Sequence, residues 1–174
     1  MPRRVSRPLP KRYLFLAAAM LLAAASFLLF IRSRAAYLVV EIPATGEIAW
    51  AAPLRGNEQF QLRYIHSVDL LPVFETYTTE GTELVLVETR FLSWGAGLGY
   101  MQEGILSGEN GWTIIKEMKR QVGTIPLRVG TIAEHTLLYR GKEIRLRDRL
   151  PAQALVHIRV KINQSSKILR EVKT

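Results

Sequence analysis

Two ionisable side chains, His66 and Glu75, stand at positions where the alternation of the sequence favours apolar side chains. Successive side chains of a strand point to opposite faces, so His66 shares the register of Phe60, Leu62 and Tyr64. Glu75 has the same relation to the apolar residues two positions before and after it. A carboxylate beside an imidazole favours the imidazolium ion, so the two groups could form a buried pair or contact a ligand.

The expected hairpin after Glu75 brings two more charged side chains into this cluster. A two-residue turn at Glu80-Gly81 is predicted, because glycine supplies the positive φ that such turns need. Counting back from this turn puts Glu75, Glu88 and Arg90 on one face, with His66 as a candidate neighbour. A three-residue loop would change that face, because a shift of one residue exchanges the two faces of a strand.

Catalysis and metal binding are two further possible roles for the same residues. Ser67 follows His66, but neighbours on a strand point to opposite faces and are badly placed as nucleophile and base. A zinc-like metal would need imidazole and carboxylate ligands. The ligands open to it are His66, Glu75, Glu88 and either Asp69 or His135. No close histidine spacing supports such a site, so we expect no metal, no cofactor and no catalysis.

A glycine-rich loop closes the block at Gly95, Ala96, Gly97, Leu98 and Gly99. Glycine accepts positive φ and lets another group approach the backbone closely. The loop could hold an anion through its backbone N–H groups, or it could let the chain turn tightly at a sheet edge. No helical pattern follows it, which argues against a phosphate-binding loop or a dinucleotide site.

Together these stretches resemble a known family. The segments YIHSV, PVFETY and FLSWGAGL, at residues 64–68, 72–77 and 91–98, are similar to the signature of a bacterial domain of unknown function, the family numbered eighteen-fifty. The resemblance covers residues 36–160, and Gly99 stands where the family pattern has a proline. Members typically have an N-terminal membrane anchor and occur beside or fused to TRAP-type solute transporters of the TAXI class. The resemblance therefore implies a location and a partner, and no reaction.

The net charge of +9 is concentrated at the N-terminal end of the chain. Residues 1–34 hold seven of the 24 Lys and Arg residues and none of the 15 Asp and Glu residues. Subtracting those seven leaves 17 basic against 15 acidic residues in the rest. The body is nearly neutral, so the composition does not predict nucleic-acid binding. Cysteine is absent, which excludes disulfides and thiolate chemistry.

Residues 13–31 form an apolar run of 19 residues, YLFLAAAMLLAAASFLLFI, without a charge. At about 1.5 Å per residue, such a helix covers the hydrocarbon core of a bilayer, so a transmembrane signal anchor is predicted. More basic residues precede the run than follow it, which places residues 1–12 in the cytoplasm and the body outside. The alternative is a cleaved signal peptide, with Ser33 and Ala35 before the cut.

The remaining sequence predicts an all-β domain over residues 36–163, followed by a basic tail at residues 164–174. Short apolar runs separated by turn residues, without a long helix or a repeat, are typical of a compact sandwich or a partly closed barrel of about eight or nine short strands. Residues 154–162 alternate most clearly between apolar and polar side chains, which predicts a half-buried strand.

These observations favour a single-pass protein of the cell membrane with an extracytoplasmic domain and no catalytic activity. Its expected partners are membrane lipid, through residues 13–31, and TRAP transporter subunits or the solute-binding protein, which the family resemblance implies. The alternative is an envelope enzyme, or a protein that binds a small ligand or a metal through the cluster around His66 and Glu75.

Overall fold

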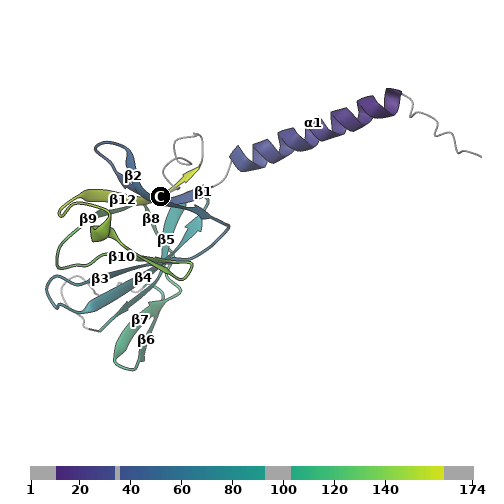
Figure 1. The fold of residues 1–174 in the computed structure, drawn as a ribbon. Helices are drawn as coiled ribbons and strands as arrows, with labels where there is room; N and C mark the ends of the chain where they lie inside the picture. The colour runs from purple at the N-terminus through teal and green to yellow at the C-terminus, as the bar shows by residue number, and fades with distance from the viewer. Residues whose placement is uncertain (1–10, 34–35, 93–102, 163–174) are drawn as a thin grey trace, which may run out of the picture. The chain divides into compact units, whose positions relative to one another are not determined.

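The computed structural model describes residues 11–33, 36–92 and 103–162 of this protein. The chain divides into two compact units, residues 1–35 and residues 36–174. The first unit contains a helix, and the second contains all the described strands (Figure 1). The predicted glycine-rich loop at residues 95–99 and the tail at residues 164–174 lie outside the described residues.

The helix, α1 (Lys11–Ser33), contains the whole of the apolar run predicted to be a membrane anchor. Large apolar side chains along it are exposed, among them Phe15 and Met20, whose exposed fractions are 77% and 74%. None of the helical segments in the described part of the chain combines the length and the apolarity of a membrane span. The anchor at residues 13–31 therefore stays a prediction.

The described part of the second unit is mostly strand, as the alternation of the sequence predicted, but it holds twelve strands rather than eight or nine. They are β1 (Ala36–Ile42), β2 (Glu47–Leu54), β3 (Phe60–Ile65), β4 (Pro72–Glu80), β5 (Glu83–Phe91), β6 (Ile105–Glu109), β7 (Trp112–Lys116), β8 (Arg120–Gly123), β9 (Ile125–Arg128), β10 (Thr136–Tyr139), β11 (Lys142–Arg145) and β12 (Leu155–Ile162). A short 3-10 helix, η1 (Leu146–Asp148), follows β11. The strands β6 and β8 were not predicted, because they are short and their sequences do not alternate between apolar and polar residues. They account for part of the larger number.

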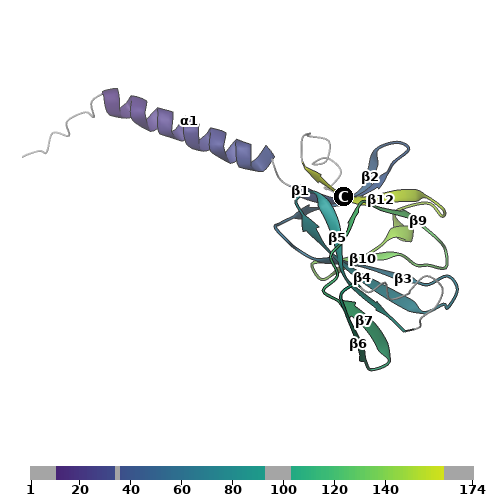
Figure 2. The same cartoon turned by 180° about the vertical axis from the view of Figure 1, so that it is seen from behind.

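The described strands form two open sheets and no closed barrel. The four-stranded sheet has the order β2-β1-β12-β9. The eight-stranded sheet has the order β11-β10-β3-β4-β5-β7-β6, and β8 also pairs with β5. The β6–β7 hairpin lies at the end of the body away from β1 and β12 (Figures 1 and 2). Strands far apart in the sequence are thus neighbours, most clearly β1 with β12.

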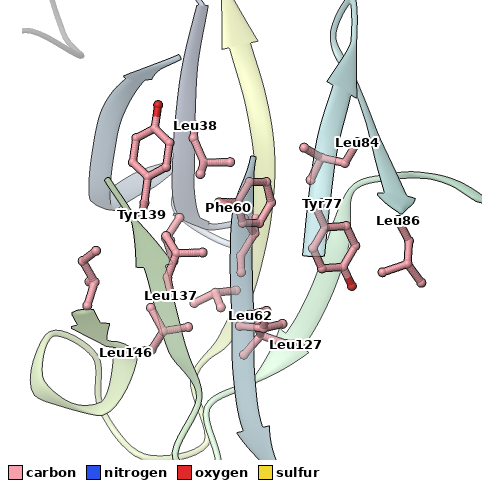
Figure 3. Packing of buried hydrophobic residues seen from close by; sticks show 14 of the residues in the cluster. Leu38, Phe60, Leu62, Tyr77, Leu84, Leu86, Leu127, Leu137, Tyr139 and Leu146 are labelled. Atoms are coloured by element: carbon pink, nitrogen blue, oxygen red, sulfur yellow. The ribbon is translucent and has the colours of Figure 1, made fainter. Parts of the chain in front are cut away.

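One hydrophobic core is shared by the two sheets. Figure 3 shows side chains of β1, β3, β4, β5 and β10 converging on the same space. Phe60 of β3 is 1% exposed and stacks on Tyr77 of β4, with ring centroids 5.3 Å apart. The largest fully buried side chains also include Leu38, Leu84 and Leu137. Phe60 and Leu62 were both predicted to face the core from β3, and the burial of both side chains confirms this prediction.

The alternation predicted for residues 154–162 is confirmed in β12. Its odd-numbered side chains face away from the core, and two of them, Arg159 and Lys161, bind Glu41 of β1. Arg159 Nη2 and Lys161 Nζ each lie 2.5 Å from a Glu41 carboxylate oxygen. Glu41 is only 5% exposed, so these two cations balance a buried charge on this face of the four-stranded sheet.

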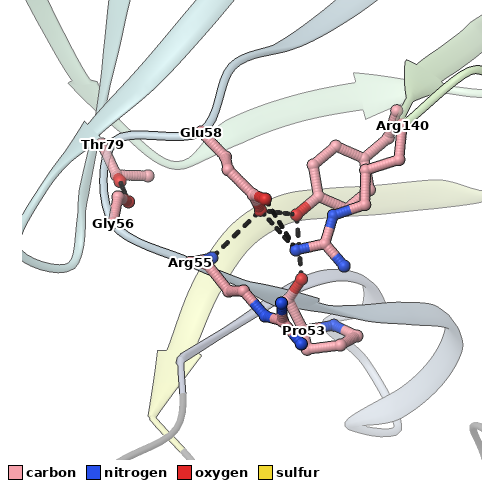
Figure 4. Close-up of polar contacts among 7 residues, drawn as sticks. Pro53, Arg55, Gly56, Glu58, Thr79 and Arg140 are labelled. Atoms are coloured by element: carbon pink, nitrogen blue, oxygen red, sulfur yellow. Dashed lines mark hydrogen bonds and ion pairs between the residues drawn. The ribbon is translucent and has the colours of Figure 1, made fainter.

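A second ion-pair cluster ties the connection between β2 and β3 to β10 (Figure 4). The Tyr139 hydroxyl donates to Glu58 Oε2 at 2.5 Å, and Arg140 Nη2 donates to both oxygens of Glu58. The hydrogen bond from Tyr139 and those from Arg140 lower the pKa of Glu58 to about 2. Its partners come from a segment some eighty residues away, which is why the sequence did not point to this cluster.

Candidate functional site

Glu75 faces the core, as its place in the alternation predicted. In β4 it lies opposite Leu62 of β3 and Thr89 of β5. The Tyr77 hydroxyl donates a hydrogen bond to Glu75 Oε2 at 2.7 Å, and the Tyr64 hydroxyl donates to Oε1 at 3.3 Å. Both carboxylate oxygens therefore have a phenol partner inside the fold.

Burial dominates the protonation of this cluster. It raises the pKa of Glu75, although the hydrogen bonds from Tyr77 and Tyr64 and the charge of Arg120 act in the opposite direction. Burial, together with the negative charge of Glu75, also raises the pKa of both tyrosines. The tyrosines therefore keep their protons, and Glu75 is an acid whose neutral form is favoured by its surroundings.

His66 has a different carboxylate neighbour from the predicted one. Its Nδ1 lies 3.4 Å from Asp69 Oδ2, and it accepts a hydrogen bond from the Asp69 backbone N–H at 3.4 Å. The backbone of residues 66–71 closes into a turn, with the His66 N–H donating to the Leu71 carbonyl and the Leu70 N–H donating to the His66 carbonyl. Because β3 ends at Ile65, His66 belongs to this turn, together with the exposed Ser67.

The contacts of the two groups thus differ from the predicted pairing of His66 with Glu75, and only Glu75 lies in a strand at its predicted place in the alternation. Glu75 lies opposite Leu62, and Tyr64 is the next inward-facing residue along β3 toward His66. The Tyr64 hydroxyl therefore occupies the position beside the Glu75 carboxylate that was predicted for His66. In the described contacts, Glu75 accepts from the two tyrosines and His66 lies beside Asp69, so the two groups have different neighbours.

Glu88 and Arg90 lie on the outer face of the eight-stranded sheet, not beside Glu75. Glu80 pairs with Glu83, so the turn contains Gly81 and Thr82 and lies one residue later than predicted. The register then shifts between Thr76 and Tyr77, because Val87 has no opposite partner. Such a bulge exchanges the faces of the residues that follow it. Glu88 consequently lies opposite Thr76, and Arg90 opposite Phe74.

On this outer face Arg90 joins two aromatic rings. Its guanidinium carbon lies 5.3 Å from the centre of the Trp112 ring, and the Phe74 and Trp112 rings are 5.6 Å apart in an edge-to-face arrangement. All three side chains are half-buried. We call Phe74, Arg90 and Trp112 the aromatic cluster. The outer face thus presents a cation-π contact at Arg90, which the sequence predicted to lie beside Glu75 on the inner face.

Comparison with protein-family models identifies the relatives of this chain. Residues 60–146, half of the 174, match the model of a domain of unknown function, DUF1850. The chain belongs to the DUF1850 family. The match begins at the first residue of β3 and contains the whole eight-stranded sheet, but only β9 of the four-stranded one. No curated protein and no solved structure is similar enough to this chain to count as a match.

The DUF1850 match contains Glu75, the two tyrosines that bind it, and the aromatic cluster. It is narrower than the predicted range of 36–160, because β1, β2 and β12 lie outside it. In the described part of the DUF1850 protein, no group of three or more His, Asp or Glu side chains could hold a metal ion.

Sequence reasoning missed the tyrosines as partners of Glu75. A signal was present, because Tyr64 has the inward parity of β3 and Tyr77 stands two residues after Glu75 on the same face. His135 also lies close to this end of the DUF1850 domain. Its ring centre is 5.8 Å from that of Tyr64, and burial lowers its pKa. Its Nδ1 is buried and has no hydrogen-bond partner among the described residues.

The raised pKa of Glu75 predicts how a Glu75→Gln variant of the DUF1850 protein responds to pH. A carboxyl group whose pKa is higher in the folded state than its ordinary 4.5 stabilises the fold below that value, and this contribution is lost as the pH rises through the folded pKa. Glutamine resembles the neutral acid and does not ionise. The variant should therefore match the wild type near pH 4.5 and exceed its thermal stability at pH 8, by about 1.4 kcal/mol for each unit of the shift.

Thermal unfolding of both proteins from pH 4.5 to pH 8 measures this difference. The exposed Glu109 of β6 supplies the control, because Glu109→Gln should give a constant offset across the range. A Glu75→Gln variant that loses stability progressively as the pH rises would show that the buried carboxylate is favoured over the acid, contrary to this prediction.

Proposed function

We propose that this DUF1850 protein is a non-catalytic accessory domain of a TAXI-class TRAP solute transporter, anchored in the membrane through residues 13–31. Its body would lie outside the cytoplasmic membrane and dock on the solute-binding protein or on the membrane subunits. The family resemblance suggests the transporter, and the aromatic cluster on the body is the surface that we propose for docking.

The observation that carries the docking role is the aromatic cluster. Tryptophan, tyrosine and arginine are the residue types that most often dominate the energy of protein interfaces. Trp112 and Arg90 lie together on the outer face of the eight-stranded sheet, and both side chains are already half-buried. A partner that covers them would complete the desolvation of both side chains at a small further cost in side-chain freedom.

The contacts of the polar residues support a role without catalysis. Both oxygens of Glu75 accept hydrogen bonds from tyrosines, and His66 shares a turn with Asp69. Glu88 and Arg90 lie on the other face of the sheet. The ionisable groups that the sequence singled out are thus distributed over three neighbourhoods, which favours structural and binding roles over a shared reaction.

Support for the anchor comes from the sequence and from α1. Residues 13–31 carry no charge, and basic residues flank the run on both sides. Exposed apolar side chains such as Phe15 and Leu21 would gain from burial in lipid, at about 25 cal/mol per Å² of apolar surface removed from water. Extraction of membranes at alkaline pH tests this point, since an anchored chain stays in the membrane pellet.

Co-purification tests the docking role. Full-length tagged protein is isolated from membranes of its source organism in a mild uncharged detergent, and the bound proteins are identified. TAXI-class transporter subunits should be recovered with the wild type. Recovery should fall about thirtyfold with Trp112→Ala, which corresponds to the loss of about 2 kcal/mol that is typical of an interface hot spot.

The matched control is Leu155→Ala, which removes a large apolar side chain, 43% exposed, from the four-stranded sheet. This variant should retain the transporter subunits, and the circular dichroism of both variants should match that of the wild type. If no transporter subunit is recovered, and solute uptake is unchanged after deletion of the protein, the proposed function is wrong.

A second candidate function is the binding of a small ligand or metal in the envelope, with or without a reaction, beside His66 and Glu75. His135 favours it, because its buried Nδ1 has no hydrogen-bond partner in the described part of the chain and its ring lies close to that of Tyr64. Heat stabilisation of the full chain by metal ions or small acids discriminates between the two candidates. A large stabilisation that is abolished by His66→Ala would support this one.

A further inference from the structure

A hollow of about 420 Å³ opens where β3, β10 and β11 lie side by side. Its walls carry three arginines, and we call it the arginine hollow. The residues that line it are Arg63, Tyr64, Ile65, Glu134, Thr136, Arg145 and Arg147. The volume is in the range of about 300–1,000 Å³ that is common for small-molecule sites. His66, Ser67, Glu75, Glu88 and Arg90, the predicted functional residues that the structure describes, do not line it.

The strand register fixes two of the arginines on one face. Arg145 of β11 lies opposite Thr136 of β10, and Thr136 lies opposite Arg63 of β3. Side chains opposite each other in neighbouring strands point to the same face, so the two guanidinium groups flank the threonine. Thr136 is only 2% exposed, and its hydroxyl donates to the Glu134 carbonyl at 2.9 Å. It therefore forms the floor, and Arg147 of η1 adds a third guanidinium group.

The residues that line the hollow include three arginines against one acid, Glu134. Arg63 pairs with Glu143 at 3.0 Å, and Arg147 pairs with Glu134 at 2.9 Å, while Asp148 lies 3.9 Å from Arg147. In both pairs the side chains are substantially exposed, and exposed ion pairs contribute little to stability. Arg145 has no ion-pair partner within the described ranges, and its side chain is exposed. An anion that enters the hollow thus meets one uncompensated guanidinium group and two weakly held ones.

We propose that the arginine hollow binds a small anion through carboxylate or phosphate oxygens. The planar guanidinium fork matches two oxygens of either group and forms charge-assisted hydrogen bonds with them. Arg145 is the principal contact, because it is free to turn toward the ligand. Arg63 and Arg147 bind the remaining oxygens when the ligand replaces Glu143 and Glu134 as their partners. The same chemistry recognises a dissolved anion or the phosphate of a lipid headgroup.

Titration calorimetry tests this site on the full-length protein in an uncharged detergent at low salt. The probes are inorganic phosphate, succinate, and dihexanoyl-phosphatidylglycerol below its micellar concentration, with dihexanoyl-phosphatidylcholine as the zwitterionic control. Saturable one-to-one binding of at least one anionic probe is expected. Binding of phosphate or succinate assigns the site to a soluble anion, whereas binding of the glycerol lipid alone assigns it to a headgroup.

Variants connect the binding to the hollow. Arg145→Ala should weaken binding about tenfold, which is the usual effect of one charge-assisted contact. The control Arg149→Ala removes the same charge from an exposed residue four positions later that does not line the hollow. It should leave the affinity within about twofold, because an exposed charge that does not line the hollow is screened by solvent and makes no contact with the anion. Glu134→Gln should tighten binding several-fold, because it removes the nearer of the two carboxylates at Arg147.

Two results would overturn the proposal: no saturable binding of any anionic probe, or equal weakening by Arg145→Ala and Arg149→Ala. The second would mean that the probes respond to the overall charge of the domain. Thermal midpoints within about a degree of the wild type confirm that the variants are folded, since substitutions of exposed residues change stability little. The transporter is absent from these measurements, so their outcome is independent of the docking role.

Discussion

Replacement of Phe60 by alanine is expected to lower the free energy of unfolding by about 3–5 kcal/mol, the usual cost of emptying an aromatic site in a packed core. Phe60 is 1% exposed and stacks on Tyr77, with an angle of 15° between the ring planes. Its removal takes away its own buried surface and one wall of the Tyr77 site. Denaturant unfolding of the full-length protein, followed by tryptophan fluorescence, measures the loss.

Phe60→Leu is the matched control, because leucine keeps much of the volume and should cost less than about 1.5 kcal/mol. The double variant with Tyr77→Leu tests the stacking directly. The two single losses should not add, because residues in contact share part of their interaction energy. A loss below 1 kcal/mol for Phe60→Ala would mean that the core is not centred on this ring.

The second large effect is expected at Glu41, on the opposite face of the four-stranded sheet from the core. Glu41→Ala leaves Arg159 and Lys161 without the carboxylate that each approaches at 2.5 Å. Breaking a buried ion pair by removing one partner costs about 3–5 kcal/mol. The side chains of Arg159 and Lys161 are 38% and 27% exposed, so water compensates part of the loss, and about 2–3 kcal/mol is expected.

The same unfolding measurement compares Glu41→Ala with Glu109→Ala, whose side chain is exposed in β6. The control should change stability by less than about 0.5 kcal/mol, as is usual for surface substitutions. High salt should reduce the difference between the two variants only slightly, because a charge that is 5% exposed is poorly screened. Equal stabilities for the two variants would show that Glu41 is solvated in the folded protein.

Family membership and strand content could be predicted from the sequence because both depend on local patterns. The alternation in β12 and the inward register of Phe60 and Leu62 follow from the two-residue repeat of a strand, and both were confirmed. The family resemblance rested on short motifs that the DUF1850 match contains. The strands β6 and β8 were missed because backbone pairing forms them without a clear alternation.

The sequence predicted which face of its strand a candidate residue occupies only where no bulge interrupts the alternation. Glu75 was correctly assigned to the inner face, but one unpaired residue, Val87, moved Glu88 and Arg90 to the other side of the sheet. The sequence contains no clear signal of this bulge. Every residue of β5 that follows it lies on the opposite face of the sheet from the one that counting predicts. The register beyond it therefore could not be counted from the turn.

The sequence by itself determined the all-β character of the body, the inward position of Glu75 and the apolar run at residues 13–31, because each depends on residues close together in the chain. The tertiary structure decided which groups meet: the tyrosines at Glu75, the rings around Arg90, and the arginines about Thr136. These meetings depend on strand order and register across the whole sheet. Both are set by the packing of distant segments into one core, which no local pattern encodes.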